Sequence, residues 1–306
     1  MAAGADPRVV IDRIERLIQT DVGRNIGPLC DAACGGLWGG ASALAVAHHC
    51  RVGLITGFYV PTGSPPAAET DGPIGAALLA KGLAAVGVPC RLATDDPCRN
   101  VCEVALVAAG ASGVPVDTAT PGAPVTPLIE SWRAAGVTHA ISIERCGRSA
   151  DGAPRNMRGL DIGSFTAPLD DLFEAGPWQT IAVGDGGNEI GMGSLPRTLI
   201  AQYVAHGEQI ACVTPAQHLI VAGVSHWGAY ALIGALAVLR SDWRDLLMEC
   251  LDEALEQRVL EASLADGPAV DGVSRVQALT IDNLDLATHR AQMRKIRALA
   301  ESGHAV

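Results

Sequence analysis

Short apolar runs alternate with helical patterns along most of this chain of 306 residues. Helical patterns at 74–85 and 125–135 lie between runs that predict strands. The predicted strands are seven in number and cover residues 52–56, 88–93, 104–109, 137–143, 180–183, 209–213 and 219–224. Strands that are apolar throughout are typical of a parallel sheet covered on both faces. The pattern therefore predicts a three-layer αβα, doubly wound, Rossmann-like α/β fold with a mostly parallel sheet of about seven strands.

Amphipathic patterns open and close the chain. Near the start, Val10, Ile14 and Ile18 recur at helical spacing. From about residue 241 the pattern predicts one long covering helix, then turns or short strands at 271–274 and 280–283, and a basic closing helix at 288–298. Nothing in the composition marks a boundary or a linker. We therefore predict a single α/β domain over 1–306, with a helical and short-strand extension from about 241.

Composition and charge narrow the class of protein. A hydrophobic content of 49% supplies a large core, and a formal charge of −11 without any Lys/Arg run argues against nucleic acid and anionic membrane partners. Residues 221–239 are apolar enough to suggest a membrane span, but Ser225 and His226 interrupt them, so a strand, a polar loop and a buried helix are expected.

Cysteine usage indicates a reducing compartment. The nine cysteines are odd in number and scattered, and no signal segment opens the chain, which favours a cytoplasmic location. The pairs Cys30/Cys34 and Cys98/Cys102 lack the spacing of a zinc site, so buried thiols are expected.

The segment 180–193, TIAVGDGGNEIGMG, places an acidic glycine loop directly after a predicted strand. Asp185 and Glu189 would repel a phosphate, the P-loop Lys-Ser/Thr is missing, and Glu189 stands where a dinucleotide fingerprint has its third glycine. We therefore expect no nucleotide cofactor. The loop suits an ammonium group, a divalent cation or acid–base chemistry. The alternative is a structural role for the same sequence, in which the glycines turn the chain and the acids cap the following helix.

Other polar residues follow the remaining predicted strands. Ligands of an open parallel sheet bind outside the carboxyl ends of its strands. The candidates at these ends are Thr56, Gly57, Glu69, Asp71, Glu144, Arg145, Arg148, Ser225 and His226. Asp71 also has the position of a helix N-cap before Pro73, and His226 is either a general base or a structural hydrogen-bonding residue.

Three arginines, Arg145, Arg148 and Arg158, lie near a glycine-rich bend and are suited to binding a carboxylate. The alternative is that Arg148 and Arg158 pair with Asp151 and Asp161.

Carboxylates that meet in one site need compensation, because like charges raise one another's pKa. One solution is Mg²⁺ or Mn²⁺ bound by Glu69, Asp71 and Asp185. The other is a protonated carboxyl that serves as a general acid near neutral pH. The sequence leaves both open.

Four motifs together resemble the D-glutamate cyclase family, and in particular its carboxy-terminal domain. They are GDGGNEIGMG at 184–193, ETDGP at 69–73, ISIERCGR at 141–148 and VAGVSHWGAYAL at 221–232. The resemblance implies a carbon–oxygen hydro-lyase that converts D-glutamate to 5-oxo-D-proline and water. In fused members a hydro-lyase-like domain precedes this one, which leaves open whether a separate partner chain of that kind takes part. At position 226 the family leads us to expect Asn, and this chain has His.

The resemblance suggests roles that the residue types allow. Asp185 or Glu189 would take a proton from the substrate ammonium, and Glu69 or Glu144 would protonate the departing oxygen. N–H groups at Gly186 and Gly187, or a metal, would stabilise the oxyanion, and Arg145 or Arg148 would hold the α-carboxylate. The remaining expected substrate contacts are Thr56, Gly57, Asp71, Asn188 and Ser225.

Two alternatives to a cyclase use the same residues. The first is a metal-dependent hydrolase acting on 5-oxoproline or a related amide. The second is a non-catalytic subunit that binds a small acidic amino acid for a hydro-lyase-like partner. A homo-oligomer is compatible with either.

Overall fold

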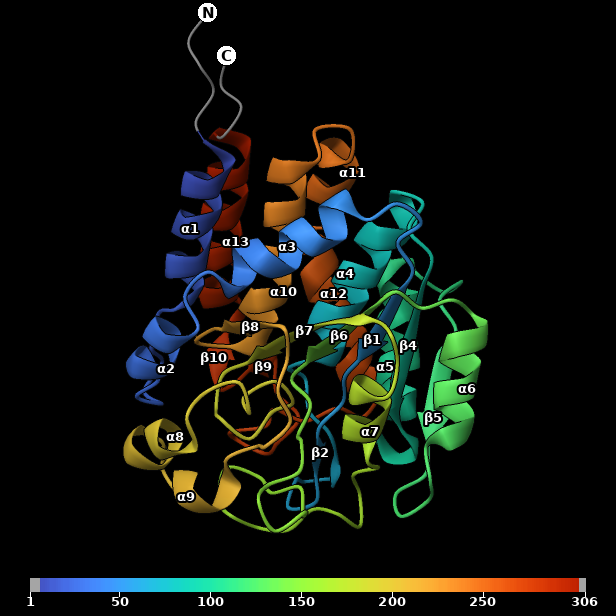
Figure 1. Ribbon diagram of the computed structural model, residues 1–306, viewed down its shortest axis with the longest axis vertical. Helices are drawn as coiled ribbons and strands as arrows, with labels where there is room; N and C mark the ends of the chain where they lie inside the picture. The colour runs from blue at the N-terminus through green and yellow to red at the C-terminus, as the bar shows by residue number, and fades with distance from the viewer. Residues whose placement is uncertain (1–5, 303–306) are drawn as a thin grey trace, which may run out of the picture.

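The computed structural model describes residues 6–302 (Figure 1). Its strands are β1 (Val52–Ile55), β2 (Tyr59–Val60), β3 (Ala67–Ala68), β4 (Cys90–Asp95), β5 (Val116–Ala119), β6 (His139–Ile143), β7 (Gln179–Gly184), β8 (His218–Val221), β9 (Thr280–Ile281) and β10 (Leu284–Asp285). Its helices are α1 (Pro7–Ile18), α2 (Gly27–Ala32), α3 (Gly36–Val46), α4 (Pro73–Ala85), α5 (Arg99–Ala109), α6 (Thr126–Ala134), α7 (Leu169–Glu174), α8 (Arg197–Tyr203), α9 (Gly207–Ile210), α10 (Ser225–Leu239), α11 (Arg244–Met248), α12 (Glu253–Ala265) and α13 (Leu286–Ser302), with a 3₁₀ turn at Asp96–Cys98.

The main sheet has six parallel strands in the order β5-β4-β1-β6-β7-β8. The chain starts in the middle at β1, adds β4 and β5 on one side, and then returns to add β6, β7 and β8 on the other. This is the doubly wound, Rossmann-like order, and it confirms the predicted fold class. The direction of winding reverses between β1 and β6, which is where such sheets bind their ligands.

Helices cover both faces of the sheet. Leu54, Ile141 and Val183 belong to a core with α1, α3, α4, α5, α10, α12 and α13, and Figure 1 shows the first three of these with α10 and α13 on one side of the sheet. Ile55, Ala140 and Ala182, their neighbours along the strands, belong to a second core with α2, α6, α7 and α8. Side chains of a strand alternate between faces, so strands buried on both sides are apolar at most positions of either face.

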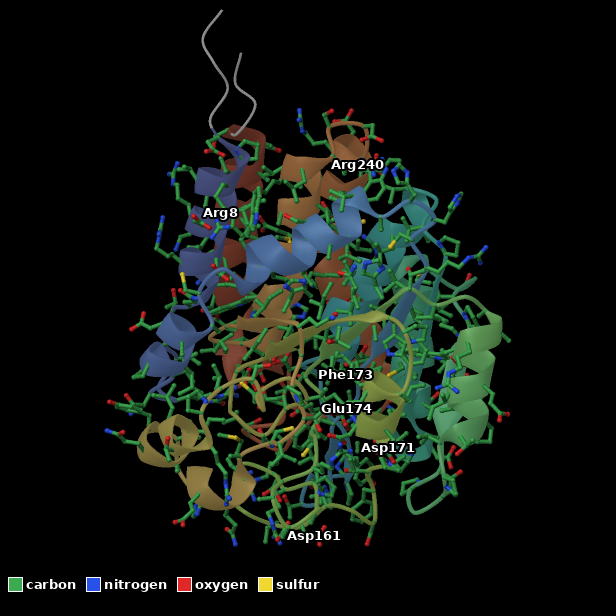
Figure 2. The ribbon with its side chains drawn as sticks, in the orientation of Figure 1. Arg8, Asp161, Asp171, Phe173, Glu174 and Arg240 are labelled. Atoms are coloured by element: carbon green, nitrogen blue, oxygen red, sulfur yellow. The ribbon has the colours of Figure 1, made fainter. Side chains whose placement is uncertain are left out.

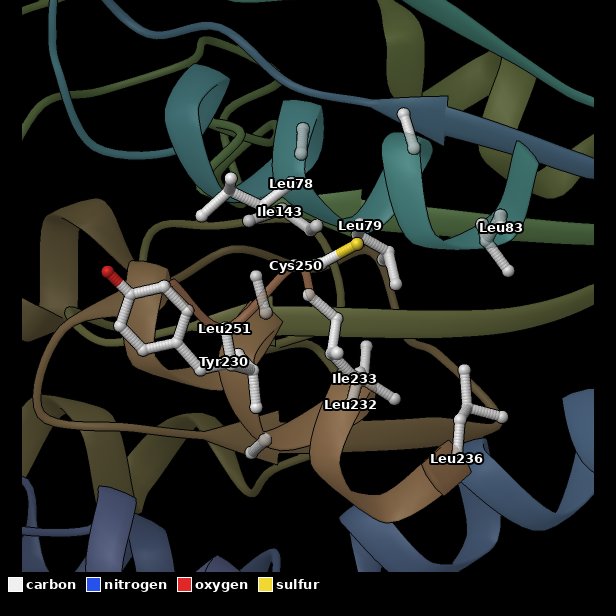
Figure 3. Close-up of a cluster of buried hydrophobic side chains, with 14 of the residues drawn as sticks. Leu78, Leu79, Leu83, Ile143, Tyr230, Leu232, Ile233, Leu236, Cys250 and Leu251 are labelled. Carbon is white, nitrogen blue, oxygen red and sulfur yellow. The ribbon is translucent and has the colours of Figure 1, made fainter. Parts of the chain in front are cut away.

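The larger core is closely packed around α4 and α10. Figure 3 shows Leu78, Leu79 and Leu83 of α4 facing Leu232, Ile233 and Leu236 of α10, with Cys250 and Leu251 beside them. Fourteen of the fifteen residues of α10 are buried. Within residues 6–302 no helix has the length and apolar character needed to cross a membrane. The apolar run at 221–239 is therefore the end of β8 and a helix enclosed by protein.

Two predicted strands were wrong, and one strand of the main sheet, β5, was missed along with the short pair β2 and β3. Residues 104–109 lie in α5, because a short apolar run fits a buried helix as well as a strand. Residues 209–213 contain the end of α9 and an irregular segment. The strand β5 escaped prediction because it is an edge strand with mostly half-buried residues and a polar sequence, VDTA. The sheet accordingly has six strands instead of about seven.

The long helix predicted from about 241 is two helices, α11 and α12. The break occurs before Asp252, whose side chain accepts the N–H of Leu255 at 2.7 Å and so caps α12. The elements α11, α12 and α13 add apolar residues to the same core as α4 and α10. The short strands β9 and β10 form a hairpin whose two turn residues, Asp282 and Asn283, have φ of 54° and 60°.

Candidate active site

A cavity of about 420 Å³ opens at the carboxyl ends of the central strands. Glu144 follows β6, Asp185 follows β7, and Glu69 precedes α4. The charged residues that line the cavity are Arg24, Glu69, Glu144, Arg158, Asp185 and Asp282. The fold therefore brings together acidic groups that are far apart along the chain, at the point where the winding reverses.

Three buried carboxylates form the floor of this site. Asp71, Glu144 and Asp185 each offer an oxygen, and these atoms lie within 4.8 Å of one another. The first residue of α10 joins them: the Ser225 N–H donates to Asp71 Oδ2 at 3.1 Å and to Asp185 Oδ2 at 2.9 Å, and its hydroxyl donates to Glu144 Oε2 at 2.5 Å. A helix N-terminus carries partial positive charge, so α10 stabilises the ionised acids.

Glu69, Asp282 and Arg24 complete the charged set. Glu69 is buried, and its Oε1 has no hydrogen-bond partner among residues 6–302. Arg24 forms ion pairs with Asp185 and, at 2.7 Å, with Asp282. Within the described chain, no other cation is ion-paired with these acids.

The acids hold their protons more tightly than free carboxyl groups. Burial raises the pKa of Glu69, Asp71, Glu144 and Asp185 well above the ordinary value, and the neighbouring carboxylates raise it further. Arg24 opposes the increase in the pKa of Asp185. Such a site is able to keep at least one carboxyl group protonated near neutral pH.

Glu144 also has an unusual backbone conformation. Its φ of 44° lies in the left-handed region, which non-glycine residues rarely adopt. Strain of this kind persists where the surrounding structure enforces it, often at functional sites. Gly72 packs against Glu144, since a Cβ at that glycine would lie 3.0 Å from Glu144 Cβ and 2.6 Å from Thr56 Oγ1. The approach of α4 to β6 thus requires a glycine at position 72.

Glu189 shapes the glycine loop instead of lining the cavity. Its Oε1 accepts the N–H groups of Asp185 and Gly186, at 3.1 and 2.6 Å, and its Oε2 accepts the N–H of Gly187 at 2.7 Å. The two N–H groups that the sequence suggested for an oxyanion therefore already have an acceptor. Asn188 is buried and donates to the carbonyl of Arg155 at 2.8 Å, so it ties the loop to the neighbouring segment.

Of the three arginines suited to binding a carboxylate, Arg158 lines the cavity, and Arg145 and Arg148 lie outside its lining. Arg145 is buried against Asp95, and its guanidinium also donates to the carbonyl oxygens of Gly57, at 2.9 Å, and Ala167, at 2.7 Å. Arg148 lies at the surface, paired with Asp171 and Glu174, two residues of α7 labelled in Figure 2. Asp151 pairs with Arg155 rather than with Arg148.

Thr56 and Gly57, which the sequence predicted as substrate contacts, do not line the cavity. Thr56 is fully buried, and its hydroxyl lacks a partner in the described residues. Gly57 has φ of 105°, and a Cβ there would lie 2.4 Å from Thr94 Oγ1. These two residues turn the chain after β1 and lead it to Phe58 and Tyr59, which line the cavity.

His226 belongs to a buried polar network under the floor. Its Nε2 lies 3.2 Å from Glu256 Oε1, and the Tyr230 hydroxyl contacts both of them. All three side chains are buried, and none lines the cavity. The network fastens the first turns of α10 to α12, and therefore fixes Ser225 against the acids.

Sequence reasoning missed Arg24 and Asp282. Asp282 lies in the β9–β10 hairpin turn, which the Asp-Asn pair signals without indicating where the turn lies in space. Arg24 lies in a turn closed by Asp21 Oδ1, which accepts the N–H groups of Gly23 and Arg24 at 2.9 and 2.8 Å. These residues predict a turn, but they do not predict that the turn lies beside Asp185.

The floor carboxylates fit a divalent cation. They supply only oxygen ligands, as Mg²⁺ and Mn²⁺ prefer, and the lining carries more carboxylates than arginines. The group differs from the predicted set, because Glu144 takes the place of Glu69.

Comparison with known proteins shows the family to which the chain belongs. Residues 14–297 match the model of the family described as "D-glutamate cyclase-like, C-terminal". The chain is also 30% identical over 291 residues to the human protein named "D-glutamate cyclase, mitochondrial". That match covers 82% of this chain and 46% of the human protein, so the chain spans about half the length of this curated relative. With the family model covering nearly all of the described residues, the chain belongs to the D-glutamate cyclase-like, C-terminal family.

Proposed function

We propose that this chain catalyses the cyclase reaction, in which D-glutamate loses water to form 5-oxo-D-proline. The observation that carries the proposal is a group of buried carboxyl groups: Glu69, Glu144 and Asp185 line one small cavity, and Asp71 lies beside the last two. Membership of the family and the name of the human relative support the choice of substrate.

The reaction needs groups that move protons. The substrate ammonium must lose two protons, and the departing oxygen must gain two, for the nitrogen to bond the γ-carbon and water to leave. We assign Asp185 as the base, because it lines the cavity and carries a raised pKa. We assign Glu69 as the acid, because burial raises its pKa and its Oε1 is not engaged by another described residue.

A divalent cation is the proposed source of oxyanion stabilisation. Bound by Asp71, Glu144 and Asp185, Mg²⁺ or Mn²⁺ would polarise the γ-carboxyl group. The N–H groups of Gly186 and Gly187 are engaged by Glu189 and leave this role unfilled. Asp185 is both a candidate ligand and the proposed base, so the metal requirement decides which role it has.

The test incubates the purified chain with D-glutamate or L-glutamate, with Mn²⁺ or EDTA, and measures 5-oxoproline by chiral chromatography. We expect product from D-glutamate, and we expect Asp185→Asn to lower kcat by about 10²–10⁴-fold. Arg240→Gln is the control, since Arg240 pairs with Asp242 far from the cavity at the surface (Figure 2). Full activity of the Asp185→Asn variant would exclude Asp185 as the base.

The same assay separates the alternatives. Hydrolysis of 5-oxoproline with no turnover of D-glutamate would identify a hydrolase. Stabilisation by D-glutamate without turnover would indicate a binding subunit, and activity gained only with a hydro-lyase-like protein would indicate a shared enzyme.

All nine cysteines are free in the structure, and we propose a reducing compartment such as the cytoplasm.

A further inference from the structure

The cavity is lined by carboxylates and by two arginines, Arg24 and Arg158. Glu144 and Asp185 contribute to its acidic floor. Arg24 lines it too, but Arg24 is already paired with Asp185 and Asp282. Arg158 is the other arginine of the lining, and its side chain is exposed to solvent. In the described part of the chain, Arg158 forms no ion pair, so its charge is available to a ligand.

The other arginines of this segment all form ion pairs, so the lack of one at Arg158 is unusual here. Arg145 pairs with Asp95, Arg148 with Asp171 and Glu174, and Arg155 with Asp151. Of the four arginines between positions 145 and 158, Arg158 alone lines the cavity and lacks a carboxylate partner in residues 6–302.

A closed turn fixes the backbone that carries Arg158. Asn156 is buried, and its Oδ1 accepts the N–H groups of Arg158 at 3.0 Å and Leu160 at 3.1 Å. The Asn156 N–H donates to the carbonyl of Leu160, and Gly159 closes the turn with φ of 77°. Arg155 adds a bond from Nη1 to the Gly159 carbonyl at 2.9 Å. The turn therefore presents Arg158 to the cavity from a fixed position.

We propose that Arg158 is the specificity-determining residue that binds the α-carboxylate of the substrate. The inference rests on the proposed function, because that reaction requires the amine and the γ-carboxyl group to lie among the acids that exchange protons with them. The α-carboxylate does not react, and the acidic floor would repel it. Arg158 lines the same cavity and has no carboxylate partner in residues 6–302, so it supplies a free planar donor that matches a carboxylate.

The test compares D-glutamate with D-isoglutamine, in which a neutral amide replaces the α-carboxylate, in the wild-type chain and in Arg158→Gln. A charge-assisted hydrogen-bonded pair corresponds to about a 10- to 100-fold change in affinity. We expect Arg158→Gln to raise KM and the calorimetric Kd for D-glutamate by about that factor, with kcat reduced much less. For D-isoglutamine we expect a change below about threefold, and Arg158→Lys should restore part of the affinity for D-glutamate.

Equal losses for the two ligands in Arg158→Gln would overturn the proposal, because a merely structural role does not depend on the α-carboxylate. Unchanged affinity for D-glutamate would overturn it as well. Binding that depends on Arg158 without turnover would support the role of Arg158 and refute the proposed reaction. Turnover with no dependence on Arg158 would refute only the role of Arg158. Arg240→Gln is the control for a lost surface arginine.

Discussion

Replacing Arg24 with Met tests whether the acids at the cavity depend on an arginine for their stability. Arg24 bridges Asp185 and Asp282, and the side chains of these three residues are 18%, 2% and 5% exposed. Breaking a buried ion pair costs about 3–5 kcal/mol, because a charge is left without compensation. Arg24 is partly exposed and Asp185 is able to take up a proton. We therefore expect Arg24→Met to lower the free energy of unfolding by about 3 kcal/mol, the lower end of that range.

The matched control is Arg148→Met. Arg148 also bridges two carboxylates, Asp171 and Glu174, but these three side chains are 32%, 57% and 36% exposed. Surface ion pairs contribute about 0–1 kcal/mol. In a chain of 306 residues, 1 kcal/mol corresponds to about 2 °C in Tm, so we expect losses of about 6 °C for Arg24→Met and at most about 2 °C for Arg148→Met.

The measurement is urea unfolding followed by tryptophan fluorescence, together with calorimetry, at pH 8 and pH 5. Arg24 lowers the pKa of Asp185, so its removal costs most where Asp185 must ionise, at pH 8, and less at pH 5. Equal losses for the two variants, or a deficit for Arg24→Met that is no larger at pH 8 than at pH 5, would refute the reasoning.

Three further predictions concern the pH dependence of the wild-type chain, the carboxylate of Glu189 and two glycine positions. The folded-state pKa of Glu69, Asp71, Glu144 and Asp185 is raised, so these four groups bind more protons in the folded than in the unfolded chain above about pH 4; Tm should rise from pH 8 to pH 7, and a flat profile would contradict this. Below about pH 7 the lowered pKa of His139, His218 and His289 acts in the opposite direction, because these histidines bind protons more readily in the unfolded chain. Glu189→Gln should destabilise by about 1–3 kcal/mol in urea unfolding, because its amide NH₂ would face a loop N–H that now donates to a carboxylate; a loss below the error of the measurement would argue against this role. Gly36→Ala should cost at least about 1–3 kcal/mol, since its Cβ would lie 1.7 Å from the Leu219 carbonyl oxygen, whereas Gly27→Ala, with nothing within 4 Å, should leave Tm nearly unchanged.

The fold was predictable from sequence where its elements are buried. The strands β1, β6 and β7 are mostly apolar, which is typical of a sheet covered on both faces. Prediction failed where the local pattern is ambiguous, as at 104–109, and where burial is slight, as in the edge strand β5. In both cases the deciding factor is the partner that the segment packs against, which a local window does not contain.

The site was predictable as a set of strand ends and not as a set of contacts. Asp185 and Glu144 follow strands, and a parallel sheet brings the ends of its strands to one edge. The distribution of the arginines was not predictable, because an arginine on a glycine-rich bend pairs with whichever carboxylate lies nearest. Arg145 is held by Asp95, 50 positions away in the chain.

The alternation of apolar runs and helical patterns by itself determined the layered α/β class, and the acidic glycine loop by itself indicated chemistry at the end of a strand. Hydrophobic periodicity is a local property of the sequence, so the elements that it produces are predictable without a structure. The tertiary structure alone decided which charges meet. Ser225 reaches Asp71 across 154 positions, and Arg24 reaches Asp282 across most of the chain, because strand order and helix packing set those distances. Charge pairing depends on distance in space, and a sequence records only distance along the chain.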